Sequence, residues 1–180
     1  DNMGLPLTDG LMTVHNALVG TGLRGRIRIG ASGKVATGND MVKRLIHGAD
    51  YTNSARAMMM ALGCIQAQRC HTNRCPVGVT TQDPKRARAL DVADKALRVQ
   101  RYHASTVRQA VRLMASMGVD EPGGLTTDML RKKVSPTTVR SYTELYEWLA
   151  PGALLADPPP MWSADWRAAT PDSFRPRSRS

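Results

Sequence analysis

Three cysteines lie within twelve residues of this chain and none lies elsewhere, which strongly constrains the local fold. They are Cys64, Cys70 and Cys75, separated first by five and then by four residues. Thiols this close together predict one shared ligand and a loop shaped around it, rather than dispersed core packing. Three thiols cannot all pair as disulfides, and the sequence shows no secretory signal that would point to an oxidising compartment. The spacing leaves zinc, an iron–sulfur cluster and inert buried thiols as alternatives.

The number of available ligands favours an iron–sulfur cluster over zinc. A closed zinc site takes four protein ligands, and the only local candidate for the fourth is His71. Adjacent Cys70 and His71 would have difficulty reaching one small tetrahedron. A cluster of three irons needs one thiolate for each iron, so three cysteines match it without a fourth ligand. Pro76 directly follows the last cysteine, as a proline does in bacterial ferredoxin sequences.

The cysteine segment resembles the cluster loop of glutamate synthases. Residues 61–84 read ALGCIQAQRCHTNRCPVGVTTQDP, and the likeness extends upstream over GLRGRIRIGASGKVATGNDMVKRLIHGADYTNSARAMMMALGC. Over residues 1–150 the chain is similar to the FMN-binding glutamate synthase family. The resemblance implies an α/β fold, namely the C-terminal part of a (β/α)8 TIM barrel with about its last two βα units, followed by a helical extension. It also implies that Cys64, Cys70 and Cys75 hold a [3Fe-4S] cluster beside FMN.

The order of the expected elements agrees with consecutive βα units. Glycines, capping residues and apolar periodicity predict a helix that Thr8 or Asp9 caps, a strand, a helix that Asn39 or Asp40 caps, a second strand and a third helix. A long helix that Asp94 caps should then bury a stripe at Ala104, Val107, Val111, Met114 and Met117. The strands are expected at residues 26–31 and 49–53, the helix starting at Ser54 ends near Leu62, and two later helices are expected at residues 126–133 and 136–149.

Two loops that follow the expected strands have the composition of an anion site. Ser32, Gly33 and Lys34 follow the first strand, and Ser54, Ala55 and Arg56 open the helix after the second. Glycine lets backbone N–H groups approach a phosphate, and free N–H groups at a helix start favour an anion. Phosphate sites of (β/α)8 barrels lie in the loops after strands 7 and 8. The resemblance implies that the phosphate is that of FMN, although glutamate synthases have threonine in place of Arg56.

Composition excludes some classes of protein. The chain has 180 residues and a net charge of +10, but its basic residues are spread along the sequence and aromatic residues make up only 4%. It therefore offers no stacking platform for single strands, and we expect no nucleic acid as a partner. No apolar run approaches the roughly 18 residues of a membrane span. We expect a cytoplasmic protein without a membrane span.

The chain begins with Asp1, which together with the resemblance predicts a fragment that lacks the N-terminal part of its barrel. We expect four regions. They are the last βα units in residues 1–63, the cysteine cluster loop in residues 64–83, a helical extension in residues 84–156 and an irregular Pro/Ser/Arg-rich tail in residues 157–180.

The resemblance implies an oxidoreductase that forms L-glutamate. Electrons would come from ferredoxin or an NAD(P)H-dependent reductase and pass through the cluster to FMN. The flavin would reduce 2-iminoglutarate, formed from 2-oxoglutarate and ammonia, where the ammonia is free or comes from glutamine. The catalytic residues are expected on earlier strands, so the fragment alone should be inactive. Two alternatives come from other classes: a non-catalytic zinc-binding interaction module, and a basic nucleic-acid-binding fragment.

Overall fold

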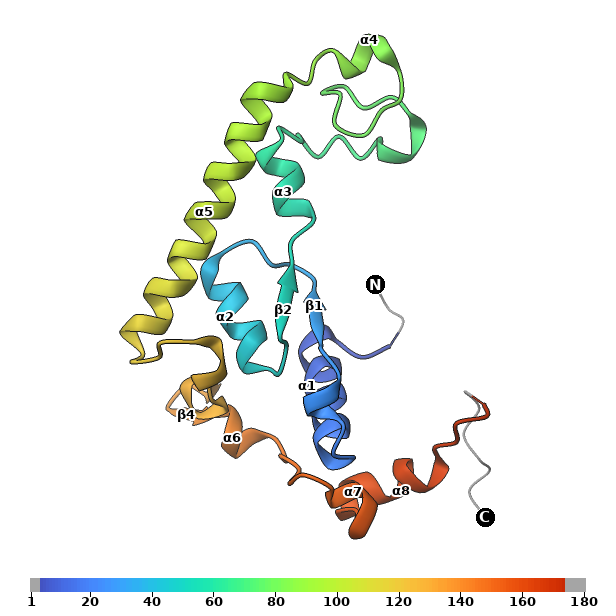
Figure 1. The fold of residues 1–180 in the computed structure, drawn as a ribbon, viewed down its shortest axis with the longest axis vertical. Coiled ribbons are helices and arrows are strands. Elements are labelled where there is room, and N and C mark those ends of the chain that lie inside the picture. The colour runs from blue at the N-terminus through green and yellow to red at the C-terminus, as the bar shows by residue number, and fades with distance from the viewer. Residues whose placement is uncertain (1–3, 174–180) are drawn as a thin grey trace.

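In the computed structural model the chain forms an elongated α/β arrangement with two small sheets (Figure 1). The structure describes residues 4–173. Helix α5 (Val92–Ser116) runs along one side of the molecule, from the cysteine loop at one end toward a hairpin, while helix α7 (Ala153–Ala156) lies at the opposite end (Figure 1). Within the described part, no helix is long and apolar enough to cross a membrane.

The N-terminal half contains the expected alternation of helices and strands. Strands β1 (Gly30–Ser32) and β2 (Tyr51–Asn53) are parallel, with Ala31 opposite Thr52. The helices are α1 (Leu7–Gly20), α2 (Gly38–Ile46) and α3 (Arg56–Ala61). The first strand was expected to begin near residue 26 and in fact begins at Gly30. Arg24–Arg26 instead form a 3₁₀ turn, because the Arg24 guanidinium donates to the carbonyls of Ile27 and Gly48 and folds this segment back.

Three helix caps differ from the expectation. Helix α1 follows Pro6, so neither Thr8 nor Asp9 caps it. Helix α2 is capped by Thr37 in a reciprocal capping box with Asp40, a residue expected to be the cap itself. Helix α5 is capped by Asp91, whose carboxylate accepts the N–H of Asp94 at 3.0 Å, so the helix starts one turn earlier than Asp94 predicts.

The main core lies between α2 and α5. It contains Val42, Ile46, Ala110, Met114 and Val119, and a second cluster around β1 contains Leu11, Ile29, Ala31 and Ala49. The predicted stripe on α5 was wrong except at Met114 and the half-buried Met117, because Ala104, Val107 and Val111 are exposed. The face that packs instead carries Thr106, Ala110 and Met114. Gly38 allows this packing, since a Cβ there would collide with the backbone of Ala110.

The two helices expected at residues 126–133 and 136–149 were wrong. The middle of this region is an antiparallel hairpin of β3 (Arg131–Ser135) and β4 (Thr138–Ser141), with an irregular register between Lys133 and Ser135. The β-branched Val134, Thr138 and Val139 favour extended backbone, and Pro136 belongs in the turn. The short helix α6 (Tyr142–Leu145) follows, with Ser141 and Glu144 in a capping box.

The C-terminal extension returns to α1. Asn16 holds it there, because its Nδ2 donates to Glu147 O at 3.1 Å and its Oδ1 accepts the N–H of Leu149 at 3.1 Å. Leu149 and Leu154 are buried beside Gly20, where a Cβ would collide with both side chains. Helices α7 (Ala153–Ala156) and α8 (Pro160–Ala168) complete this region. The tail was expected to be irregular from residue 157, but α8 is helical; the last residues of the tail, 174–180, lie outside the described residues.

Candidate functional site

The two predicted anion loops line one pocket at the carboxyl ends of β1 and β2. Because Ser32 pairs with Asn53, the two strand ends lie side by side. The pocket has a volume of about 360 Å³. Five of the six predicted residues line it, together with Val35, Ala36, Asn53, Ala57 and Met60; the five are Ser32, Gly33, Lys34, Ala55 and Arg56. Ser54 does not, and its hydroxyl instead donates to Val35 O at 2.7 Å and ties the two loops together.

The pocket is cationic, and its first loop has an uncommon backbone. Lys34 and Arg56 are both exposed, and no acidic residue is among those that line the pocket. Gly33 has φ 141° and Lys34 has φ 52°, so a non-glycine residue adopts the left-handed region here. Such residues gather at ligand-binding loops. Helix α3 begins at Arg56 and has only six residues, so the positive charge of the pocket comes from the Lys34 and Arg56 side chains rather than from the helix terminus.

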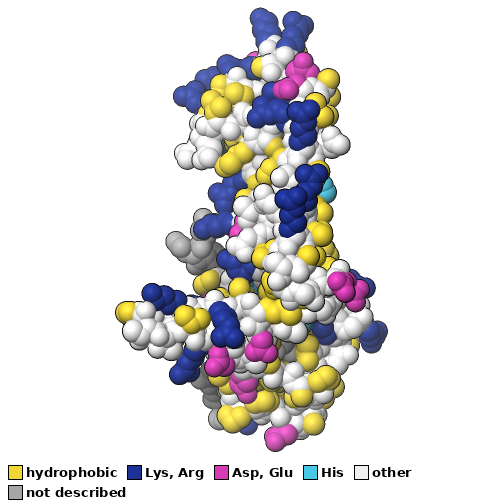
Figure 2. Space-filling view, turned by 90° about the vertical axis from the view of Figure 1, so that its left-hand side faces the viewer, with side chains coloured by type: hydrophobic (Ala, Val, Ile, Leu, Met, Phe, Trp, Pro, Cys, Tyr) yellow, Lys and Arg dark blue, Asp and Glu magenta, His cyan; other side chains and the backbone are white. Residues whose placement is uncertain are grey.

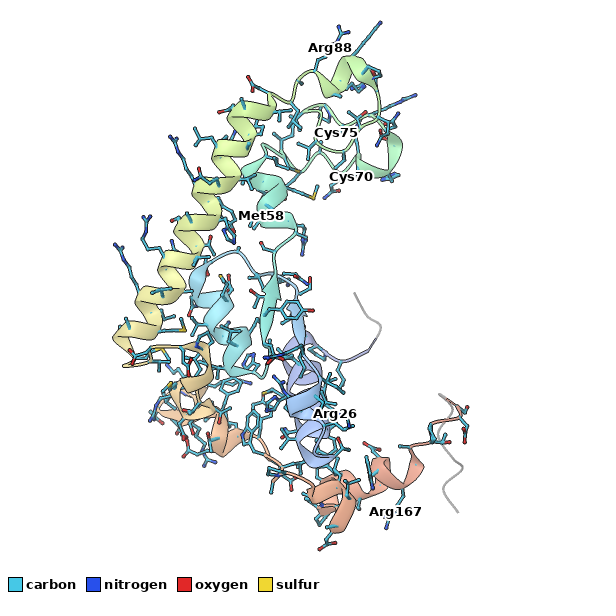
Figure 3. The ribbon with its side chains drawn as sticks, viewed as in Figure 1. Arg26, Met58, Cys70, Cys75, Arg88 and Arg167 are labelled. Atoms are coloured by element: carbon cyan, nitrogen blue, oxygen red, sulfur yellow. The ribbon has the colours of Figure 1, made fainter. Side chains whose placement is uncertain are left out.

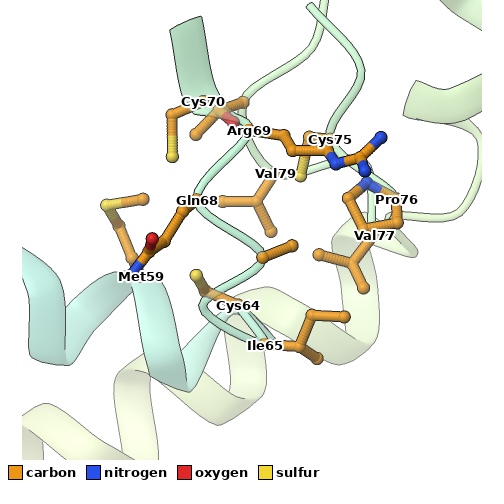
Figure 4. A pocket seen from close by; sticks show the side chains of 12 residues that line it. Met59, Cys64, Ile65, Gln68, Arg69, Cys70, Cys75, Pro76, Val77 and Val79 are labelled. Carbon is orange, nitrogen blue, oxygen red and sulfur yellow. The ribbon is translucent and has the colours of Figure 1, made fainter. Parts of the chain in front are cut away.

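The three cysteines line a second, small pocket just beyond α3. Cys70 and Cys75 lie in the loop at the far end of the molecule from Arg26 and Arg167 (Figure 3). Figure 4 shows the sulfur atoms of Cys64, Cys70 and Cys75 directed into the same space, beside Met59 and Val79. The free volume between them is only about 10 Å³. Within residues 4–173 no group of three His, Cys, Asp or Glu side chains lies close enough to hold a metal ion, so the loop gathers the thiols without bringing them to coordination distance.

Backbone donors around the cysteine pocket favour thiolate. Cys75 is buried, and the backbone N–H of Thr80 is the largest cause that lowers the pKa of its thiol to about 7. Burial opposes this shift, and backbone hydrogen bonds from Val77 and Val79 add to it. The N–H of Gln66 donates to Cys64 Sγ at 3.4 Å. The buried side-chain hydroxyl of Thr80 lies beside the same thiol and also lowers its pKa.

One residue that shapes this loop was missed by sequence reasoning. Asn73 has φ 60°, and its carboxamide Oδ1 accepts the backbone N–H of Gln82 at 2.6 Å. The hydroxyl of Thr81 donates to Asn73 O at 2.7 Å, so the loop is closed on itself. Asparagine tolerates the left-handed region and binds nearby backbone, which was the available signal. His71, the only local candidate for a fourth ligand, is exposed and does not line the pocket.

Comparison with known proteins identifies the family. Residues 1–120 match the sequence family described as the conserved region in glutamate synthase. The chain belongs to the glutamate synthase family. It is 43% identical over 122 residues to the glutamate synthase large subunit-like protein YerD of Bacillus subtilis, covering 68% of this chain. It is 35% identical over 130 residues to the glutamate synthase [NADPH] large chain of Azospirillum brasilense, covering 72% of this chain.

A third relative is the ferredoxin-dependent glutamate synthase of Pyropia yezoensis, with 38% identity over 116 residues and 64% of this chain. The matched segments are small parts of these relatives. They cover 23% of the Bacillus protein, 8% of the Azospirillum protein and 7% of the Pyropia protein. The family match ends at residue 120, so it contains both pockets and the whole of α5, whereas the hairpin and the extension that returns to α1 lie beyond it.

Proposed function

We propose that this chain supplies the last two βα units and the cysteine loop of a glutamate synthase-like (β/α)8 barrel, in an oxidoreductase that makes L-glutamate from 2-oxoglutarate and ammonia. The observation that carries the proposal is the second pocket, where all three cysteines of the matching segment face one space directly after α3. The parallel pair β1 and β2, each followed by a helix, supports the barrel assignment. Two such units cannot close a barrel alone, so preceding strands must complete it.

Lys34 and Arg56 are proposed to hold the phosphate of FMN, and Ser32, Gly33 and Ala55 line the pocket around it. Both cations face a pocket with no acidic lining, and guanidinium pairs with phosphate oxygens in a bidentate geometry. The pocket volume lies within the range of about 300–1,000 Å³ that is typical of small-molecule sites. Ser54 is assigned a positioning role, since its hydroxyl joins the two loops.

Cys64, Cys70 and Cys75 are proposed to hold the [3Fe-4S] cluster. Each ligand must be a thiolate, and the backbone N–H groups that lower the pKa of Cys75 favour that form. The buried hydroxyl of Thr80, which lies beside the Cys75 thiol, can donate to that thiolate and so tune the potential of the cluster. When bound, FMN supplies hydride transfer and the cluster carries single electrons. The chain's own share is to place these two groups, and the substrate-binding residues are proposed to lie on preceding strands.

The electron donor is proposed to be ferredoxin or an NAD(P)H-dependent reductase, because relatives are named for ferredoxin, NADPH and NADH. The cytoplasmic location expected from the sequence is kept as a proposal.

The cluster assignment is tested by iron and acid-labile sulfide analysis, with low-temperature EPR, on anaerobically purified protein that includes the preceding barrel strands. We expect about three irons with sulfide and a signal in the oxidised state, both lost in Cys70→Ser. His71→Ala is the matched control, because it should keep the cluster but would lose metal from a zinc site of three cysteines and His71. Zinc without sulfide, lost in His71→Ala, would instead establish the zinc-binding interaction module.

The flavin assignment is tested by titrating FMN into the same protein. A hydrogen bond to a charged group contributes about 1.5–3 kcal/mol, so Lys34→Gln and Arg56→Gln should each weaken FMN binding by roughly 10- to 150-fold. Arg26→Gln is the control, since Arg26 is exposed and does not line the pocket. Equal FMN affinity in all three variants would show that Lys34 and Arg56 do not bind FMN.

A further inference from the structure

A third pocket lies directly beside the proposed phosphate pocket, between α3 and α5. Its volume is about 440 Å³. Ala36, Ala57 and Met60 line both pockets, so the two are neighbours that share a wall. The other residues around the third pocket are Ala61, Arg98, Arg101 and Tyr102. Tyr102 fixes the shared wall, because its hydroxyl donates to Ala36 O and ties α5 to the loop after β1.

The charge along these two pockets exceeds what one phosphate can neutralise. Lys34 and Arg56 line the first, Arg98 and Arg101 line the third, and no acidic residue lines either. A phosphate ester carries roughly two negative charges at neutral pH. Neither Arg98 nor Arg101 forms an ion pair with any residue that the structure describes. Asp94, the one carboxylate on α5, pairs with Lys95 at 2.6 Å and interacts only at longer range with Arg98 and Arg101, so it offsets part of their charge without pairing with either.

The two arginines are placed to act on one group. They are three residues apart on a regular helix, so their side chains leave the same side of α5. They are exposed, and Figure 2 shows Lys and Arg side chains along the face that carries α5. Between them and the first pocket the floor is apolar, made by Ala57, Met60 and Ala61. Two guanidinium groups next to apolar side chains suit a small organic molecule that carries an anionic group.

We propose that the pocket between α3 and α5 binds a second anion, a phosphate or carboxylate carried on a small organic molecule, next to the phosphate of FMN. This inference rests on the proposed function only in that FMN is taken to occupy the pocket lined by Lys34 and Arg56. Arg98 and Arg101 hold the anionic group, the apolar floor contacts the organic body, and Tyr102 keeps α5 in register with the loop that carries Lys34. The class of ligand follows from the two guanidinium groups, because both phosphate and carboxylate bind to them. The two probes below distinguish a phosphate ligand from a carboxylate ligand.

The test is calorimetric titration of AMP and, separately, of glutarate into FMN-loaded protein that includes the preceding barrel strands. We expect one of the two to bind without releasing flavin; AMP binding identifies a phosphate ligand and glutarate binding a carboxylate. Arg98→Gln and Arg101→Gln should each weaken that binding about 10-fold or more. Arg108→Gln, an exposed arginine further along α5 that lines neither pocket, should leave it unchanged.

Three results would overturn the inference: no binding of either probe, equal binding in the Arg98 and Arg101 variants, or release of one FMN for each probe bound. The flavin content is read independently from its absorbance. If FMN is absent but a probe still binds and depends on Arg98 and Arg101, the flavin proposal fails while the second anion site stands. If FMN is present and no probe binds, the flavin proposal stands and the second anion site fails.

Discussion

Replacing His47 should remove a large part of the acid sensitivity of the fold. The imidazole is fully buried, and neither ring nitrogen has a hydrogen-bond partner among the described residues. It packs against the ring of Tyr142, with centroids 5.1 Å apart, and so joins α2 to the C-terminal extension. Burial, followed by the charges of Arg44 and Lys43, lowers the pKa of His47 from 6.5 to about 4.

The sign and size follow from proton linkage. Between pH 6.5 and about 4 this histidine is protonated in the unfolded chain and neutral in the folded chain. The free energy of unfolding is therefore unaffected by His47 above pH 6.5, and it decreases as the pH falls from 6.5 to about 4. A tenfold difference in proton affinity corresponds to about 1.4 kcal/mol, which gives a loss of about 3 kcal/mol by pH 4. His47→Leu should lack this loss. It should also cost little at pH 7, because no hydrogen bond of the ring is broken.

The assay is urea unfolding of the parent protein, His47→Leu and the control His103→Gln at pH values from 4 to 7.5, since His103 is exposed. Carboxylates also contribute in acid: although burial opposes it, hydrogen bonds from the N–H of Ile29 and from Arg24 lower the pKa of Asp50. Subtracting the His47→Leu curve from that of the parent removes this background. Parallel curves for the parent and His47→Leu between pH 4 and 6.5 would refute the reasoning.

Three further changes test the packing and the cysteine loop. Gly38→Ala should lower the free energy of unfolding by about 1–3 kcal/mol, because the added Cβ meets the backbone of Ala110. Asn16→Ala leaves the buried N–H of Leu149 unpaired, and should cost about 1–3 kcal/mol and speed proteolysis of the extension. Asn73→Ala should lower the iron content of purified protein, since it removes both the left-handed preference and the bond to the Gln82 N–H.

Each of these changes has a matched control. Gly25→Ala should stay within about 0.5 kcal/mol, since a Cβ at Gly25 meets nothing within 4 Å. Asn39→Ala removes an exposed asparagine and should leave the proteolysis rate as it is. Asn73→Gly keeps the backbone freedom and loses only the side chain. Unchanged stability in Gly38→Ala or Asn16→Ala would contradict the packing described for α2 or the extension, and full iron in Asn73→Gly would show that its carboxamide is dispensable.

The sequence predicted the alternation of helices and strands because turn glycines and apolar periodicity act locally, although the residues expected to cap α1, α2 and α5 were wrong. Gly48, for example, has φ 105° and ends α2 where the pattern expected. The buried face of α5 was misjudged for a non-local reason. Ala104, Val107 and Val111 are the more regular apolar stripe, yet α5 packs through its other face because Gly38 permits close approach there. The partner of a helix face cannot be read from the hydrophobicity of that face alone.

The hairpin was missed because its signals are weak and short. Arg131, Lys132 and Lys133 are good helix formers, and only tertiary context favours their extended backbone. The candidate site was more predictable, since the cysteine spacing and the loops after β1 and β2 are local features. Neither the pocket between α3 and α5 nor the loop closure by Asn73 was predictable in this way. The pocket depends on contacts between residues distant in the sequence, such as Ala36 and Tyr102. The loop closure depends on the left-handed backbone angle of Asn73, which the sequence permits but does not require.

Helix α3 connects the two proposed cofactor sites and fixes their separation. Arg56 at its start lines the phosphate pocket, and Met59 lines the cysteine pocket. The N–H of Cys64 donates to Met59 O at 3.0 Å, so the first cysteine is bonded directly to the helix. Six residues of helix extend about 9 Å and bend little over that length. Because α5 packs along α3, the spacing between flavin and cluster would be set by helix packing, while the cysteine loop, closed on itself through Asn73, would place the other two thiols.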